Sequence, residues 1–424
     1  MHYYIFQDLN EILRKIANNV KPSVSQETVE RLNSFLSKIY RIQIYKDAVF
    51  DFMEDEETKK MVYFSSDQLR NLLTNQYNEF INELHSHEII KIEEKYFKYG
   101  KHFKLFLLTD KPLKSTKISS SIKSKRVKNG LKNYYKSNYN TLKGIDKKVF
   151  NILWKIKINI TQEEIQKELH HRYSKYKKEK MEYINNLATT KEITKGMHIM
   201  TLEEYLDQSR FYYDYITLWN ESTKIEKTSF VSIDSFGNRF HSIFTTLPSF
   251  FRNYLHLDGS THIVGLDLAQ SQPTLLAKML LDEIGQNEFT MAVNSGDVYS
   301  YYPYERSNAK KQFLRSIFSN RYSKSFFELS RQFPSLGQYI LKIQNTQMYR
   351  DGKKIPSYKN TSCILQRFES RLFRKIWSKL LNSEIQFINV HDGIYVSADK
   401  VEITKEIIEK ILENELTGIR YYLK

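Results

Sequence analysis

The sequence has only one cysteine, Cys363, among its 424 residues. It therefore has neither an intramolecular disulfide nor a zinc site built on cysteines, which favours a reducing, cytoplasmic setting. No run of about 18 apolar residues is present, and no signal-peptide pattern with a cleavage site is recognisable. We therefore expect no membrane insertion. The sequence also lacks a glycine-rich phosphate loop followed by Lys and Ser or Thr, which argues against a nucleotide site of that type.

Basic residues outnumber acidic ones. The chain has 65 Lys and Arg against 49 Asp and Glu, which gives a formal net charge of +16. Because each neutralised phosphate releases condensed counterions, this balance favours nucleic acid as the partner, with anionic lipid as the alternative. A hydrophobic content of 41% is ordinary for a folded chain with a real core.

Residues 1–110 predict helices followed by a two-stranded basic element. Ser65, Ser66 and Asp67 form a cap pattern before one helix, and a second helix follows over residues 77–84. Two strands, residues 89–92 and 103–108, then flank a turn around Gly100. This order resembles the winged-helix DNA-binding domains of plasmid replication initiators. The alternative is an ordinary α+β structural domain.

Residues 111–145 carry ten basic side chains and no acidic one, with Ser and Asn between them. The composition predicts a basic linker, either a solvated connector or a strap along a nucleic-acid backbone. In the second case Tyr134, Tyr135 and Tyr139 would stack on unpaired bases. Residues 146–230 are highly charged and predict helices.

Two acidic residues follow short apolar stretches in the last part of the chain. Residues 263–266 predict a buried strand that ends at Asp267, and residues 387–390 precede Asp392. Adjacent strands would bring both carboxylates to one rim, where they would hold the two divalent ions of a phosphoryl-transfer site. The alternative makes Asp267 a helix N-cap and Asp392 a turn residue ahead of Gly393.

Arg306 and Lys310 are four residues apart, which places them on one face of a predicted helix, with Phe318 further along it. Such a face is suited to a triphosphate. The alternative is a solvated basic helix whose Phe313, Ile317 and Phe318 belong to the core.

Four stretches occur in the order that a polymerase palm and fingers need. They are residues 237–242 with Arg252 after them, residues 263–280, residues 306–319 and residues 387–396. Together they resemble the Gly-Arg segment and motifs A, B and C of family A DNA polymerases and the related single-subunit phage-type RNA polymerases. Residues 296–299 are similar to a further segment of that family, so that the resemblance covers about residues 230–400.

The resemblance implies an α+β fold with a right-hand polymerase palm, an antiparallel sheet, and helical fingers and thumb. Residues 146–230 would be the thumb-like region and residues 231–424 the palm and fingers. The implied metal ligands for two Mg²⁺ ions, or Mn²⁺ in their place, are Asp267 and Asp392. The implied nucleotide-binding residues are Arg306, Lys310, Phe318 and Gln272, with Lys310 also protonating the pyrophosphate. The implied nucleic-acid contacts are Arg239, Arg252, His391 and Gln366.

The sequence departs from the family pattern at two positions that bear on the sugar. Phe318 and Ser319 stand where motif B usually has Tyr-Gly, and Gln272 stands where the DNA polymerases have a glutamate. Phe318 lacks the hydroxyl that the RNA polymerases use around the ribose, while Gln272 retains bulk against a 2'-hydroxyl. We therefore expect deoxynucleotides to be preferred.

These observations favour a monomeric, DNA-dependent DNA polymerase of a plasmid, phage or mobile element, with a DNA template, a primer and nucleoside triphosphates as partners. The sequence has no Asp-Asp pair and no Asp-x-Asp, which disfavours reverse transcriptases and archaeo-eukaryotic primases. Two alternatives stay open. One is an RNA-synthesising primase or RNA polymerase, and the other is a non-catalytic replication initiator that binds origin DNA.

Overall fold

The computed structural model shows an α+β protein with helices and small antiparallel sheets, which confirms the α+β class that the sequence predicts. The structure describes residues 2–20, 26–49, 62–63, 66–96, 102–109, 112, 117–121, 124, 129, 133, 135–136, 138–188, 199–257, 259–303, 305–350 and 353–424. Two compact units are present. The first contains residues 1–142, 157–230 and 246–254, and the second contains residues 143–156, 231–245 and 255–424.

The first unit begins with a mixed region. Its elements are β1 (His2–Phe6), η1 (Gln7–Leu9), α1 (Asn10–Val20), α2 (Gln26–Val49), β2 (Val62–Tyr63), α4 (Ser66–Leu73), α5 (Tyr77–Ser86), β3 (Ile90–Tyr96), β4 (His102–Leu108) and β5 (Lys117–Ser121). The predicted order of two helices and a hairpin is confirmed by α4, α5 and the β3–β4 pair. The predicted turn at Gly100 and the cap residue Ser65 lie outside the described residues.

Two long helices complete the first unit. Its remaining elements are β6 (Lys157–Ile158), α9 (Gln162–Ala188), α10 (Leu202–Glu221), η2 (Glu226–Phe230) and η3 (Ser249–Tyr254). Helix α10 begins with a capping box, in which Thr201 and Glu204 satisfy each other's backbone N–H groups. It packs against α9 and α2. The helical prediction for residues 146–230 is therefore confirmed for these two helices.

The predicted basic linker lies partly outside the described residues, but parts of it can be placed. Residues 117–121 form β5, which pairs with β1 in an antiparallel ladder. Tyr135 is buried with the Lys38 ammonium 4.5 Å from its ring centroid, so its ring is not free to stack on a base. Tyr139 lies beside Lys224, whose ammonium is 5.8 Å from the ring centroid. Tyr134 falls outside the described residues.

The second unit is built on a four-stranded antiparallel sheet of order β13-β14-β10-β15. The strands of the whole unit are β7 (Ser232–Ile233), β8 (Phe240–His241), β9 (Leu255–His256), β10 (Ile263–Ala269), β11 (Tyr349–Arg350), β12 (Lys353–Lys354), β13 (Ile388–Val390), β14 (Gly393–Ser397) and β15 (Tyr422–Leu423). Strand β10 runs two residues beyond Asp267, because the chain end adds β15 to it and Lys424 exchanges two backbone hydrogen bonds with Asp267. The prediction that the strand ends at Asp267 is therefore wrong in that detail.

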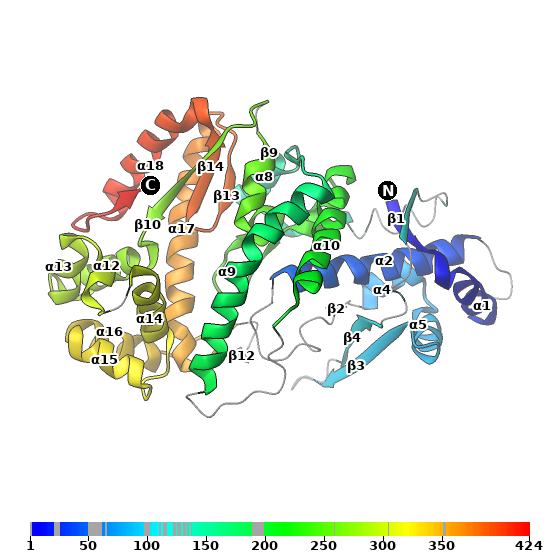
Figure 1. The fold of residues 1–424 in the computed structure, drawn as a ribbon, viewed down its shortest axis with the longest axis horizontal. Coiled ribbons are helices and arrows are strands. Elements are labelled where there is room, and N and C mark those ends of the chain that lie inside the picture. Colours follow the sequence, from blue (N-terminus) through cyan, green and yellow to red (C-terminus); the bar gives the residue numbers. More distant parts are fainter. Residues whose placement is uncertain are drawn as a thin grey trace. The chain divides into compact units, whose positions relative to one another are not determined.

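The remaining elements of this unit are helices. They are α8 (Gly144–Leu153), α12 (Ser271–Ile284), α13 (Glu288–Ser295), η4 (Val298–Tyr301), α14 (Arg306–Phe318), α15 (Lys324–Gln332), α16 (Pro334–Asn345), η5 (Ser357–Lys359), α17 (Asn360–Asn382), η6 (Ala398–Lys400) and α18 (Val401–Glu415), while α11 (Ile243–Thr246) spans the boundary along the chain. Figure 1 shows α17 running along this unit, with the sheet and α18 at one end and α15 and α16 at the other. Helix α17 packs against α8, α12, α14, α16 and α18, and is therefore its central support.

Candidate active site

Asp267 and Asp392 lie next to each other on the sheet. Asp267 is the register partner of Gly393 across the β10–β14 ladder, and Asp392 directly precedes Gly393. The backbone carbonyl of Asp392 accepts a hydrogen bond of 3.2 Å from the N–H of Leu268. Asp267 does not cap α12, because the N-cap residue is Gln270. The backbone positions of both acids therefore lie together at the hairpin end of the β10–β14 ladder.

The turn that carries Asp392 is tight. Val390 is the register partner of Gly393, which leaves a two-residue loop of His391 and Asp392 between β13 and β14. His391 has a φ of 52°, a left-handed conformation that such hairpin loops require. A Cβ atom on Gly393 would meet Oδ1 of Asp267, so the bare glycine makes room for that carboxylate. Asp392 is thus also a turn residue, as the alternative interpretation has it.

A buried carboxylate links two of the motif stretches. One Glu369 oxygen accepts a hydrogen bond of 2.5 Å from the Arg239 guanidinium, and the other accepts one of 2.6 Å from the Gln272 amide. Burial raises the pKa of Glu369 to about 7, while Arg239 lowers this pKa and the nearby charge of Asp392 raises it. Glu369 is therefore within electrostatic reach of Asp392.

The hairpin that presents Arg239 is organised by Asp234. Its carboxylate accepts hydrogen bonds from the backbone N–H groups of Gly237 and Arg239 and from His241 Nε2, at 2.5, 2.9 and 3.1 Å. Burial alone would raise the pKa of Asp234, but these hydrogen bonds, led by that from His241, lower it to about 2. Asn238 takes a left-handed φ of 55° at the tip. The sequence signal for this turn is an Asp shortly before Gly-Asn.

Gln270 ties the end of β10 to the segment that precedes α14. Its amide nitrogen donates to the carbonyl of Gly296 at 3.2 Å, and its amide oxygen accepts from the N–H of Val298 at 2.9 Å. Gln270 itself has a left-handed φ of 52°. These two bonds hold residues 296–298 against the end of β10, the strand that carries Asp267.

Tyr299 connects α14 to the carboxylate pair. The Arg306 guanidinium lies 5.5 Å from the Tyr299 ring centroid and pairs with Asp297. Burial raises the pKa of Tyr299, Arg306 lowers it, and the charges of Asp297 and Asp392 raise it further. The start of α14 and the turn of Asp392 therefore share one electrostatic environment.

The predicted helix is confirmed, because α14 begins at Arg306 and ends at Phe318. Lys310 is exposed and Phe318 is half-buried. Phe313 and Ile317 are fully buried, as the alternative interpretation has it. The helix thus presents two cations outward from an apolar inner face.

The other predicted nucleic-acid contacts are distributed more widely. Gln366 lies against Gly237, where an added Cβ would meet its side chain. The His391 ring packs edge-to-face on His241, with ring centroids 5.6 Å apart. Arg252 lies in η3 and belongs to the first unit, whereas Asp267 and Asp392 belong to the second.

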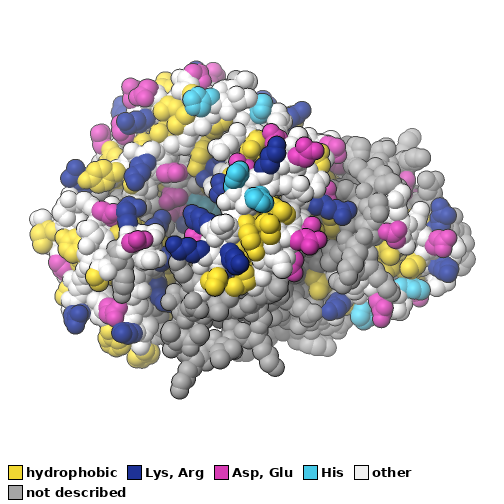
Figure 2. Space-filling view, in the orientation of Figure 1, with side chains coloured by type: hydrophobic (Ala, Val, Ile, Leu, Met, Phe, Trp, Pro, Cys, Tyr) yellow, Lys and Arg dark blue, Asp and Glu magenta, His cyan; other side chains and the backbone are white. Residues whose placement is uncertain are grey.

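The two carboxylates fit the donor preference of Mg²⁺, which takes one or two carboxylates and completes its shell with phosphate oxygens and water. Within the described ranges, no three His, Cys, Asp or Glu side chains cluster as a metal site would. Figure 2 shows Lys and Arg side chains interspersed with Asp and Glu side chains over the visible face of the described residues.

No protein-family model matches the chain, and no curated protein matches it. No helix in the part of the chain that the structure describes combines the length and the apolar character needed to cross a bilayer.

Proposed function

We propose that the second unit is the palm and fingers of a template-directed nucleic-acid polymerase, similar to family A DNA polymerases and single-subunit phage-type RNA polymerases. The observation that carries the proposal is the pairing of Asp267 with Gly393, which brings two acidic residues from distant parts of the chain to neighbouring backbone positions. The contacts of Glu369 with Arg239 and Gln272 support it, because they bring one further motif stretch, residues 237–242, to the stretch that carries Asp267.

Asp267 and Asp392 would hold the Mg²⁺ ions, or Mn²⁺ in their place. Paired divalent ions, when bound, stabilise the attacking and the leaving oxygens of a phosphoryl transfer. Arg306 and Lys310 lie in the first turns of α14. Their positive charges would offset the negative charge of a triphosphate. Lys310 would donate the proton that the pyrophosphate leaving group takes up.

Gln272 is the residue that we assign to sugar selection. Its amide nitrogen donates to Glu369, while its amide oxygen is buried and accepts no hydrogen bond from a described residue. A buried polar atom left without a partner costs free energy, so a water or ligand donor is expected there. The bulk of Gln272 disfavours a 2'-hydroxyl, and deoxynucleotides are therefore the expected substrates.

For residues 1–110 we propose a winged-helix DNA-binding domain. The order α2, β2, α4, α5, β3, β4 and the sheet order β2-β4-β3 support it. In such a domain the helix can enter a groove of DNA, while the basic hairpin contacts the DNA phosphate backbone. The hairpin tip, residues 97–101, lies outside the described residues.

The test is primer extension by the purified full chain with Mg²⁺, a labelled primer–template, and deoxynucleotide or ribonucleotide pools supplied separately. We expect template-dependent extension that is faster with deoxynucleotides. Equal or faster use of ribonucleotides would instead support an RNA-synthesising enzyme. DNA binding without any extension would reject the polymerase and favour a non-catalytic replication initiator.

A further inference from the structure

A groove of about 1000 Å³ lies along one face of α17, entirely within the second unit. Ile364, Phe368, Arg371, Lys375 and Ser378 line it at alternating spacings of four and three residues, so they share one helix face. Glu369 is two residues before Arg371, about 160° around the helix. The groove is therefore separate from the contacts that Glu369 makes beside the carboxylate pair.

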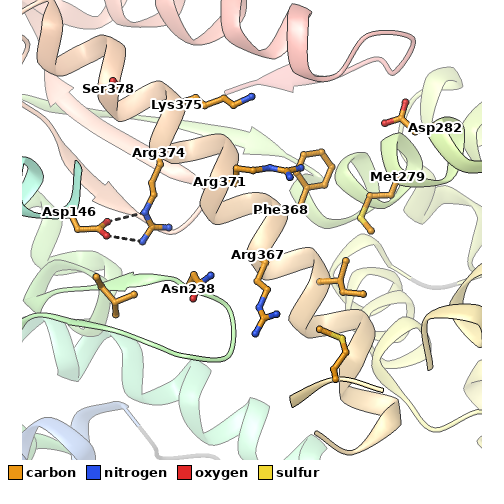
Figure 3. A pocket seen from close by; sticks show the side chains of 13 residues that line it. Asp146, Asn238, Met279, Asp282, Arg367, Phe368, Arg371, Arg374, Lys375 and Ser378 are labelled. Atoms are coloured by element: carbon orange, nitrogen blue, oxygen red, sulfur yellow. Dashed lines mark hydrogen bonds and ion pairs between the residues drawn. The ribbon is translucent and has the colours of Figure 1, made fainter. Parts of the chain in front are cut away.

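Cations outnumber acids in the groove, and its acids already have partners. Asp146 receives two hydrogen bonds from Arg374, at 3.0 and 3.3 Å (Figure 3). Asp282 pairs with Lys278. The two remaining arginines form no ion pair with a described carboxylate. Arg367 donates to the backbone carbonyl of Phe236 at 3.0 Å, which orients the guanidinium without neutralising it.

Arg371 is the exposed cation at the centre of the groove. Its guanidinium carbon lies 5.1 Å from the centroid of the half-buried Phe368 ring, and Figure 3 shows the two side chains together on the groove side of α17. The apolar side chains of Met279 and Met348 also line the groove. A ring beside an unneutralised guanidinium, in a basic groove with apolar walls, is the combination that binds unpaired bases and their phosphates.

We propose that this groove binds single-stranded nucleic acid, with Arg371 contacting phosphate and Phe368 stacking on a base. The inference goes beyond the proposed function, because a strand binds here whether or not the carboxylate pair is catalytic. Single-stranded nucleic acid is favoured over a duplex because stacking on Phe368 needs an unpaired base.

The direct test is photo-cross-linking by the full chain. Cys363 is 0% exposed, so Ser378→Cys adds one reactive thiol at the groove. With a thiol-linked benzophenone there, we expect ultraviolet cross-linking to labelled oligothymidylate that unlabelled oligothymidylate suppresses. Lys410→Cys, on the exposed side of α18, is the matched control and should give much less product. Equal cross-linking from both positions would overturn the proposal.

Binding measurements separate the two contacts. Arg371→Gln should weaken oligothymidylate binding and make the salt slope shallower by about 0.7, the value for one phosphate contact on a single strand. Phe368→Leu should weaken binding about fivefold or more without changing that slope. Lys410→Gln serves as the charge control. If both groove variants bind like the parent, or change only the affinity for free nucleotide, the proposal fails. Oligothymidylate cross-linking should persist in Asp267→Asn, so this outcome is independent of polymerase activity.

Discussion

The buried carboxyl group of Glu369 is exposed to two opposing influences on its pKa. Desolvation and the charge of Asp392 favour the protonated acid, whereas Arg239 favours the carboxylate, and together they leave its pKa at about 7. The raised pKa means that the folded state holds this proton more tightly than the unfolded chain does. The contribution of Glu369 to stability is thus complete below about pH 4.5 and is lost as pH rises through about 7.

We therefore expect the parent protein to lose more stability between about pH 5 and pH 8 than Glu369→Gln does, because the amide has no proton to release. Urea unfolding across this pH range measures the difference. Glu402→Gln, an exposed position on α18, is the control and should follow the parent. A pH dependence in Glu369→Gln as steep as that of the parent would show that Glu369 does not titrate in this range.

Residue patterns predict part of this site and miss the rest for a physical reason. Asp267 and Asp392 stand out because each follows an apolar run, and a strand pattern locates them. Gln366 is predicted as a nucleic-acid contact, and the structure places Glu369, on the same helix, against Arg239 and Gln272. The two positions are three residues apart on one helix, and helical spacing alone does not decide which of them faces a partner 130 residues away.

At the scale of elements, the β10–β14 ladder fixes where the Asp267 carboxylate lies. A side chain at Gly393 would occupy the space of that carboxylate, while one at Gly265 would meet the ring of Tyr395. The two glycines are therefore both required by packing, but only Gly393 borders the carboxylate pair.

Gly393→Ala should slow primer extension about 10- to 100-fold, because a displacement of about 1 Å at a reacting centre has an effect of that size. Single-turnover extension measures the rate. Gly265→Ala, the matched change in β10, is expected to lower thermal stability with a smaller loss of rate. Extension by Gly393→Ala at the parental rate would mean that the position of Asp267 does not matter.

Elements with strong local signals are the ones that the sequence predicts. The basic spacing of α14 and the apolar strand before Asp392 are visible in a few residues. Strand β5 is not visible in this way, because residues 117–121 have the composition of a polar linker. They form a strand only through pairing with β1, more than a hundred positions earlier in the chain. The extension of β10 beyond Asp267 likewise depends on the distant β15.

On the scale of the whole molecule, the order of the motif stretches is the basis for predicting a polymerase, but the contacts between the stretches are a property of the fold. Contacts such as that of Arg239 with Glu369 join segments far apart in the chain, and sequence spacing carries no information about them. The net charge of +16 predicts a polyanionic partner without indicating where it binds. The groove along α17 shows how a specific surface is found only once side chains are placed.

The central claim is that Asp267 and Asp392 act together in nucleotidyl transfer. The most direct measurement is single-turnover primer extension by Asp267→Asn and Asp392→Asn, with primer–template affinity determined for each variant. Asp399→Asn, at an exposed acid just after β14, is the control. We predict that each site variant loses about a hundredfold or more in rate, the scale of removing one group that stabilises developing charge, while DNA binding and the control are unchanged. Extension at the parental rate by either site variant would contradict the account.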